Sequence, residues 1–120
     1  MKTEDIINIA RQTITEEAAA VAKLTDYIDD DFTQAVDYIL HSKGRVVITG
    51  IGKSAIIANK IVATMNSTGT PAIFMHAADA IHGDLGIIQQ EDVVICISKS
   101  GNTPEIKVLV PLLKRGNNKL

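Results

Sequence analysis

Two glycine-containing loops constrain this chain of 120 residues more than any other feature. They are Gly50-Ile51-Gly52-Lys53-Ser54 and the segment Ser-Lys-Ser-Gly-Asn-Thr-Pro-Glu at 98–105. Each loop follows a short apolar run and precedes a segment with helical spacing. The start of a helix presents unpaired N–H groups and the positive end of its dipole, so each loop predicts an anion site. On neighbouring strands of one parallel sheet the loops would face a common crevice, which predicts a phosphorylated small molecule as the ligand.

Strand-like and helix-like segments alternate along the second part of the chain. Strands are expected at 45–49, 72–75 and 92–97, and helices at 54–67 and 104–115. Such alternation implies right-handed crossovers and a parallel sheet. The strands are almost continuously apolar, which is typical of strands covered on both faces. The fold class predicted is therefore α/β, a three-layer parallel sheet with helices on both faces.

The first part of the chain reads as a helical segment, 1–44, that precedes an α/β domain at 45–120. Apolar residues at helical spacing predict a helix from residue 4 to about 24. Asp29, Asp30 and Asp31 supply a cap and first-turn acids for a second helix that ends near Gly44.

The end of the sequence suggests that the α/β domain is incomplete at its C-terminus. Lys119-Leu120 looks like the start of another strand after the turn Gly116-Asn117-Asn118. A sheet of three strands would leave an apolar edge bare. We therefore expect this chain to correspond to part of a larger domain.

Composition excludes several classes of partner. The net charge is −2 with acids and bases scattered, so no nucleic-acid surface is expected. No apolar stretch approaches the roughly 20 residues of a membrane span, and the N-terminus lacks the features of a signal peptide. Cys96 is the only cysteine and lies in an apolar run, which predicts a buried, unreactive thiol and a cytoplasmic location.

The first loop resembles two known nucleotide-binding motifs only in part. A Walker A loop needs glycine where this chain has Val47. The dinucleotide pattern is matched by Gly50, Gly52 and Ala55, but the next strand ends at His76 without an acid for a ribose. Lys53 places a positive charge at the positive end of the helix dipole, which costs a little stability unless an anion binds nearby. The alternative is a lysine that simply faces solvent.

The second loop is the more specific of the two. Ser98, Ser100 and Thr103 place three hydroxyls within six residues, and Gly101 lets the backbone bend toward a ligand. Hydroxyls together with free N–H groups predict a phosphate cradle. Glu105 follows in the first turn of the helix, where an acid can simply stabilise the dipole. Beside a phosphate its pKa would rise, which would suit a general base.

A histidine-containing loop is expected after the second strand, at the edge where α/β sheets bind ligands. It holds His76, Asp79 and His82, framed by Gly83 and Gly86. A functional role for these histidines competes with ordinary surface or structural roles. A shared metal ion is the weaker reading, because two histidines fall short of the three protein ligands of a catalytic zinc site.

Four motifs in order and spacing resemble one family. They are Gly-Ile-Gly-Lys-Ser at 50–54, Ser-Thr-Gly-Thr-Pro at 67–71, His-Gly-Asp-Leu-Gly at 82–86, and Ser-x-Ser-Gly at 98–101 with Glu105. The chain resembles the sugar isomerase (SIS) domain, of flavodoxin-like fold, of D-arabinose 5-phosphate isomerases. The resemblance implies interconversion of D-arabinose 5-phosphate and D-ribulose 5-phosphate for Kdo biosynthesis. It also implies a homotetramer with active sites shared between subunits, and further strands and site residues beyond this segment.

The resemblance also implies roles for individual residues. Lys53, His82 and Glu105 match catalytic positions, and His76 matches a position associated with zinc that inhibits rather than serves as a required cofactor. The implied substrate-binding residues are Gly52, Ser54, Gly69, Thr70, Ser98, Ser100, Gly101, Asn102 and Thr103. The Asn-Thr-Pro-Glu form of the last loop is widespread in other SIS domains, which leaves the exact sugar open.

Two other functions are weighed against the isomerase. A sugar-phosphate sensor that does not catalyse is the main alternative, although a sensor has less need of Lys53, His82 and Glu105 together. A nucleotide-dependent oxidoreductase is disfavoured by the missing ribose acid.

Overall fold

The computed structural model describes residues 1–120, which divide into two units, Met1–Val36 and Asp37–Leu120. The first unit holds helix α1, Thr3–Lys23, and a 3₁₀ turn at Leu24–Tyr27. Helix α2, Asp30–His41, begins in this unit. The N–H of Phe32 donates to Asp29 Oδ1 at 3.2 Å, so the predicted aspartate cap is present.

The predicted N-terminal helices form, but α1 buries none of its residues within the chain. Ile14 and Val21 are each 66% exposed, although both belong to the predicted apolar stripe. On α2, Phe32 and Leu40 are also exposed. These four apolar side chains therefore lack a covering partner inside this chain. None of the helices is both long enough and apolar enough to cross a bilayer.

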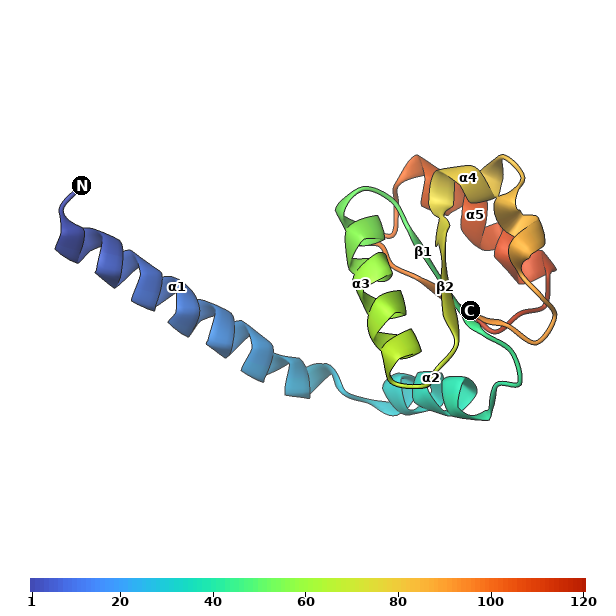
Figure 1. Ribbon diagram of the computed structural model, residues 1–120, viewed down its shortest axis with the longest axis horizontal. Coiled ribbons are helices and arrows are strands. Elements are labelled where there is room, and N and C mark those ends of the chain that lie inside the picture. Colours follow the sequence, from blue (N-terminus) through green and yellow to red (C-terminus); the bar gives the residue numbers. More distant parts are fainter. The chain divides into compact units, whose positions relative to one another are not determined.

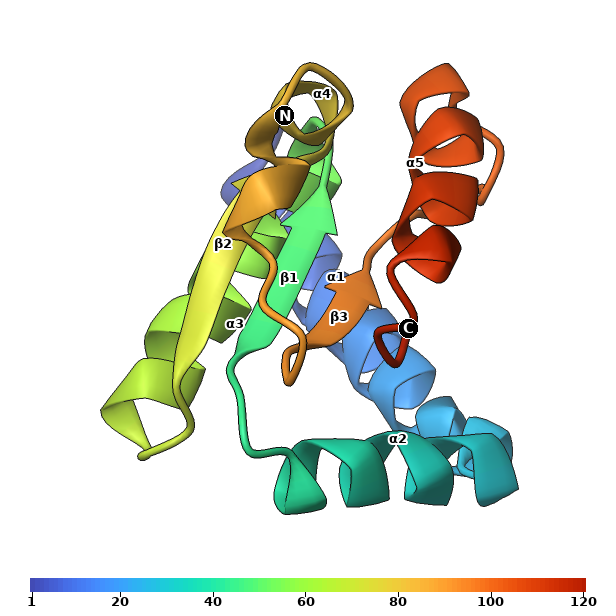
Figure 2. The ribbon, with the colours of Figure 1, turned by 90° about the vertical axis from the view of Figure 1, so that its right-hand side faces the viewer.

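The second unit is built on a parallel sheet with the strand order β2-β1-β3 (Figure 2). Strand β1 is Val46–Gly50, β2 is Ala72–His76 and β3 is Val93–Cys96. Every residue of β1 is buried, as expected for a central strand covered on both faces. The predicted parallel α/β class is confirmed.

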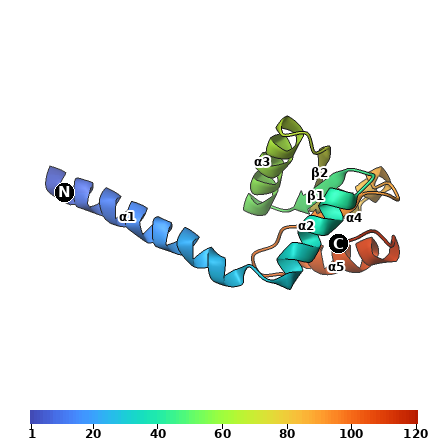
Figure 3. The same cartoon turned by 90° about the horizontal axis from the view of Figure 1, so that it is seen from below.

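Helices cover both faces of this sheet, which gives the expected three layers (Figures 1 and 3). Helix α3, Lys53–Ser67, packs on one face. Helices α4, Ala77–Ile81, and α5, Pro104–Arg115, lie on the other and contact each other. A 3₁₀ turn at Asp84–Ile87 links α4 to β3. Alternate residues of β1 point into the two resulting cores.

Helix α3 buries most of the side expected from the sequence. Of the predicted buried residues Ile57, Ile61, Val62 and Met65, the last three pack against the core, but Ile57 is 55% exposed. Ala55 and Ala58 are buried in its place. Small residues on the contact face let the helix approach the strands closely.

A second correction concerns the segment after β2, which we expected to be a loop. It contains the five-residue helix α4. Ala77 and Ala80, three residues apart, are buried against the core shared with α5. Alanine favours helix, but a run this short carries too little periodicity to be recognised from the sequence.

Of the expected fourth strand, the structure shows a single bridge residue. Lys119 forms a parallel bridge with Val93, and the N–H of Val94 donates to the Lys119 carbonyl at 2.8 Å. The position beyond β3 is that of the next strand in a sheet of order 2-1-3-4, the flavodoxin-like arrangement.

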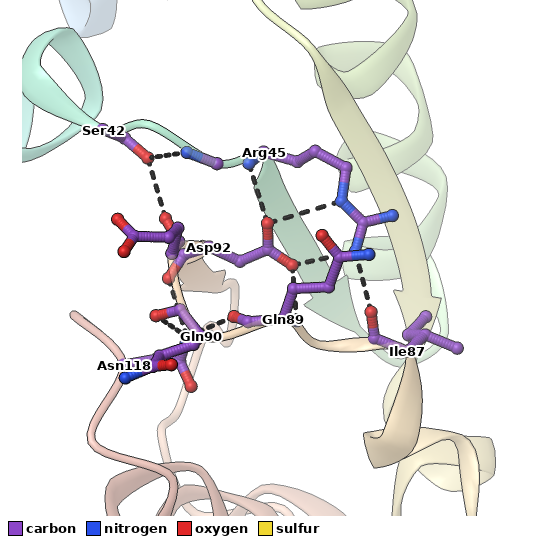
Figure 4. Close-up of polar contacts among 9 residues, drawn as sticks. Ser42, Arg45, Ile87, Gln89, Gln90, Asp92 and Asn118 are labelled. Carbon is purple, nitrogen blue, oxygen red and sulfur yellow. Dashed lines mark hydrogen bonds and ion pairs between the residues drawn. The ribbon is translucent and has the colours of Figure 1, made fainter.

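A buried polar network ties together the amino ends of the strands (Figure 4). Arg45, just before β1, and Asp92, just before β3, form an ion pair at 2.9 Å, and Asp92 is 2% exposed. The carboxylate also accepts the N–H groups of Arg45 at 2.7 Å and Gln89 at 2.8 Å. Asn118 donates to the Asp92 carbonyl at 2.8 Å. These contacts hold together the three segments that contain Arg45, Asp92 and Asn118.

The charge state of Asp92 follows from these contacts. Burial alone would raise its pKa. The side-chain bond from Arg45, the two backbone N–H groups and the Arg45 charge outweigh burial, and the pKa of Asp92 lies below its ordinary value. The carboxylate is therefore charged in the folded protein at neutral pH.

Replacing Asp92 should destabilise the fold strongly. Asp92→Asn leaves Arg45 without its buried counter-charge and puts an amide donor among groups that donate. We expect the free energy of unfolding at pH 7, measured by urea denaturation, to fall by about 2–4 kcal/mol. Asp37→Asn is the matched control. Its carboxylate pairs with His41 on the surface and is 64% exposed, so the loss should stay within about 0.5 kcal/mol.

The Asp92 contribution should also depend on pH. The folded-state pKa is below that of the unfolded chain, so the stabilisation is complete above the unfolded value of about 4 and is lost as pH falls through the folded-state value. The stability gap between wild type and Asp92→Asn should narrow as pH is lowered from 6 toward about 2. A gap that widens in acid would contradict this assignment.

Candidate active site

The two glycine loops meet at the carboxyl ends of β1 and β3. Pairing of these strands continues past the last register pair, because the Ile97 N–H donates to the Thr49 carbonyl at 2.9 Å. A Cβ placed on Gly50 would lie 3.2 Å from the Ile97 carbonyl oxygen and 3.2 Å from Ser54 Cβ. Glycine at this position therefore lets the first turn of α3 lie against the end of β3.

The connections leave these two strand ends on opposite faces of the sheet. From β1 the chain enters α3 and crosses one face to β2, whereas from β3 it enters α5 on the other face. The two helices therefore diverge between β1 and β3. This reversal of strand order is where doubly wound sheets form a crevice for ligands.

Helix α3 begins without any side-chain cap. Its N-cap is Gly52, with φ +60° and ψ −129°, a conformation that L side chains rarely adopt. A Cβ built on Gly52 would meet no atom within 4 Å, so the start of the helix faces open space. Lys53 is the first helical residue and is exposed. The N–H groups of this turn and the lysine amine are available to an anion.

The Ser98 loop is held in shape by its own hydroxyls. Ser98 Oγ accepts the N–H of Gly101 at 2.8 Å, and Ser100 Oγ accepts the N–H of Asn102 at 3.1 Å. Gly101 takes φ +69° and has open space where a Cβ would lie. Two of the N–H groups expected to be free are thus occupied by serines. A bound phosphate would have to replace those hydroxyls as acceptor.

Helix α5 also begins without a side-chain cap. Thr103 is its N-cap residue, yet its hydroxyl makes no capping bond, and Oγ1 is buried without a partner. Pro104 occupies the first turn and has no N–H to lose. Two helix starts without side-chain caps therefore follow β1 and β3, whereas α2 and α4 are capped by side chains.

The predicted catalytic residues come from three elements near this edge. Lys53 opens α3, and half-buried Glu105 lies in the first turn of α5, on the other side of the crevice. His82 is the exposed C-cap of α4, which starts at the end of β2 and packs against α5. The fold thus brings the segments that carry all three residues to the carboxyl side of the sheet.

Gly69 and Thr70 are not brought to this edge. They follow the C-terminal end of α3 and precede β2, so they lie at the amino edge of the sheet. Thr70 is held there by its N–H, which donates to the Met65 carbonyl at 2.9 Å. The 15 residues of α3 separate them from Lys53 by about 22 Å along the helix axis. Within one chain these two residues cannot contact a ligand bound at the glycine loops.

Two side chains beneath the loops, one fully buried and one half-buried, have no counterpart in the sequence-based site. Thr49 is fully buried, and its Oγ1 lacks a hydrogen-bond partner. It pairs in register with Cys96, which is partly exposed rather than fully buried as expected. Burial still raises the pKa of the Cys96 thiol, consistent with an unreactive thiol. In the sequence, this threonine lies in a run of β-branched residues, so nothing distinguishes it from the core residues around it.

The position expected for zinc does not offer a metal site. No group of three or more His, Cys, Asp or Glu residues lies together in this chain. The Nδ1 atom of His76 is occupied as acceptor for the Ala78 N–H at 3.2 Å. One histidine engaged in this way does not fit the ligand set of a zinc ion.

Two hollows of the surface lie away from the glycine loops. One of 310 Å³ is lined by the last turn of α2 and by residues 90–93 and 117–119, and one of 520 Å³ lies between residues 85–91 and the end of α5. Both adjoin the network around Asp92 at the amino edge and contain none of the predicted site residues. The candidate site is therefore identified by the helix starts and polar groups of the glycine loops and not by either of these hollows.

A doubly wound parallel sheet with two uncapped helix starts at its strand-order reversal defines an α/β protein whose candidate ligand site lies at that reversal. The chain belongs to the SIS domain family, whose model matches residues 39–120. It is 46% identical over 112 residues to arabinose 5-phosphate isomerase GutQ of Escherichia coli K12 and 50% identical over 111 residues to arabinose 5-phosphate isomerase KdsD of Pseudomonas aeruginosa. These matches cover 93% and 92% of this chain but 35% and 34% of the relatives. The chain thus spans about a third of their length.

Solved structures support the same assignment. A protein of E. coli CFT073 in complex with arabinose 5-phosphate matches 98% of this chain with a TM-score of 0.90 and 42% identity, over 63% of its own length. Tagatose-6-phosphate ketose/aldose isomerase of E. coli, at 21% identity and a TM-score of 0.58, shares the fold. The resemblance to SIS domains drawn from the four motifs is confirmed.

Alanine at two glycines should have opposite effects on stability. Gly52→Ala forces a side chain into a backbone conformation it disfavours, so the free energy of unfolding should fall by about 1–3 kcal/mol. Gly86 has no positive φ and equally open surroundings, so Gly86→Ala should leave stability unchanged or raise it by about 0.4–1 kcal/mol. Urea denaturation of both variants measures this contrast. Equal losses at the two sites would show that the α3 start is not strained.

Proposed function

We propose that this chain forms the phosphate-binding part and a share of the catalytic apparatus of a D-arabinose 5-phosphate isomerase, which interconverts that sugar with D-ribulose 5-phosphate. The observation that carries the proposal is that two helix starts without a side-chain cap, those of α3 and α5, follow the carboxyl ends of the neighbouring strands β1 and β3. The names of the relatives supply the sugar, and so does the arabinose 5-phosphate bound to the similar structure.

The loops divide the work of binding. Ser98, Ser100, Gly101, Asn102 and Thr103 would hold the phosphate at the start of α5, where N–H groups and hydroxyls favour an anion. Gly52 and Ser54 would approach the sugar from the start of α3. The unpartnered Thr103 hydroxyl is a donor ready for a phosphate oxygen.

Isomerisation moves a carbonyl between C1 and C2 through an enediolate. We propose Glu105 as the base that takes the proton from the carbon beside the carbonyl, giving the enediolate, and returns it to the former carbonyl carbon. Lys53 would stabilise the negative charge that develops on the oxygen, since a cation close to that oxygen lowers the energy of the transition state. His82 would carry a proton between the two oxygens. These steps use protein side chains alone and require no cofactor.

A homotetramer with shared sites is part of the proposal. Gly69 and Thr70 can contact substrate only if a second copy presents its amino edge to the glycine loops of the first. The exposed apolar residues of α1 and α2 supply surface that such an assembly could bury. We further propose a cytoplasmic enzyme whose product supplies Kdo biosynthesis, as the family resemblance implies.

A chimera tests the function despite the difference in length. Residues 1–120 would replace the matching segment of E. coli GutQ, with unaltered GutQ as the control. Conversion of D-arabinose 5-phosphate to D-ribulose 5-phosphate by the chimera supports the isomerase. A folded chimera that binds the sugar phosphate without turnover favours a sensor instead. A folded chimera that neither binds nor converts it rejects both functions.

Glu105→Gln in that chimera should separate catalysis from binding. The amide keeps the size and hydrogen-bonding capacity of the side chain but cannot accept the proton. We expect kcat to fall by about 10²–10⁴-fold, with KM within about threefold of the parent, in a coupled assay for D-ribulose 5-phosphate. Asp79→Asn, an acid of α4 outside the proposed catalytic set, is the matched control and should retain activity. A Glu105→Gln variant with parental kcat would remove Glu105 from the role of base.

A further inference from the structure

His76 performs a structural task at the junction of β2 and α4. Its backbone ends β2, where it pairs with Gly50, and its φ of −66° and ψ of 131° are those of a helix N-cap. Its ring Nδ1 accepts the N–H of Ala78 at 3.2 Å, so the imidazole takes the place of the usual Ser, Thr, Asp or Asn cap. The ring is half-buried and lies edge-on to Phe74, with centroids 6.2 Å apart.

This hydrogen bond determines which ring nitrogen carries the proton. A neutral imidazole has one N–H donor and one acceptor nitrogen. Because Nδ1 accepts from Ala78, the proton of the neutral ring belongs on Nε2. A metal needs a nitrogen lone pair, and neither nitrogen then offers a free one. Zinc at Nε2 would move the proton to Nδ1 and set two N–H donors against each other at the start of α4.

The helix that this cap begins leads directly to His82. Helix α4 has only five residues, and His82 is its C-cap residue, with its N–H donating to the Asp79 carbonyl at 3.1 Å. The helix is anchored to the core by two alanines, Ala77 and Ala80, whose methyl groups hold it in place with little surface. The direction in which His82 leaves α4 therefore depends on how the first turn is fixed.

We propose that His76 is a positioning residue: a neutral cap that orients α4, and through it His82, rather than a ligand for zinc. The proposal rests on the proposed function only where it gives His82 a catalytic role. The cap itself is a statement about the fold, so the two parts can fail separately.

Two amides distinguish the nitrogens of His76. In His76→Asn, Oδ1 takes the position of Nδ1 and can cap α4, but no atom remains at Nε2. In His76→Gln, the amide reaches toward the Nε2 position and leaves no acceptor where Nδ1 was. Capping predicts that asparagine substitutes for histidine, whereas metal or substrate binding through Nε2 predicts that glutamine does.

Amide hydrogen exchange of Ala78, followed by NMR on residues 1–120, tests the cap directly. We expect protection to be kept in His76→Asn and exchange to be at least about fivefold faster in His76→Gln. Adding one equivalent of Zn²⁺ should leave the wild-type ring signals of His76 and the Ala78 exchange rate unchanged. Equal exchange in the two variants, or a shift of the His76 ring signals with release of Ala78, would overturn the proposal.

Kinetics of the same variants in the GutQ chimera test the positioning of His82. We expect His76→Asn to keep kcat within about threefold and His76→Gln to lower it at least about tenfold, with KM unchanged in both. The reverse order would overturn the positioning role. If the parental chimera is itself inactive, the isomerase proposal fails, and the exchange data still decide whether His76 is a cap.

Discussion

Parallel pairing of β1 with both of its neighbours is the constraint on which the rest of this structure depends. Parallel strands cannot be joined by tight turns, so each connection must cross a face of the sheet. The route through α3 covers one face, and the elements after β2 and β3 cover the other. Strand β1 is therefore buried throughout, and its apolar, β-branched sequence is the necessary consequence. The same connectivity reverses the strand order between β1 and β3, the position at which doubly wound sheets bind ligands.

The two edges of the sheet handle charge in opposite ways. At the amino edge, Asp92 is a buried anion whose partners, Arg45 and the backbone N–H of Gln89, are all supplied by the chain. At the carboxyl edge, neither the start of α3 nor that of α5 has a side-chain cap, and only α5 has an acid, Glu105, in its first turn. Internal pairing stabilises the fold at the amino edge. At the carboxyl edge, the proposed function assigns the donors to a substrate phosphate.

Residues with a local physical signature were predictable from the sequence. The glycine loops, the apolar strands and the aspartate cap of α2 depend on neighbours in the sequence, and the structure has each where expected. The exposure of Ile57 on α3 was not predictable, because it depends on how closely Ala55 and Ala58 approach the sheet. Helix α4 was missed because five residues carry too little periodicity. In addition, its cap is a histidine, a residue type associated with metal binding more than with helix starts.

The predicted substrate residues show where sequence reasoning reaches its limit in a single chain. Motifs in order along a sequence carry no information on which edge of the sheet each one reaches. The fold places Gly52 and Gly101 at the carboxyl edge of the sheet, but it places Gly69 a helix length away. If all of them contact one substrate, the missing distance has to be supplied by a second chain, since α3 is a rigid element that cannot shorten. The geometry of one sheet thus makes an active site shared between chains a physical requirement of the isomerase proposal. A demonstration that a monomer turns over the sugar would contradict that proposal.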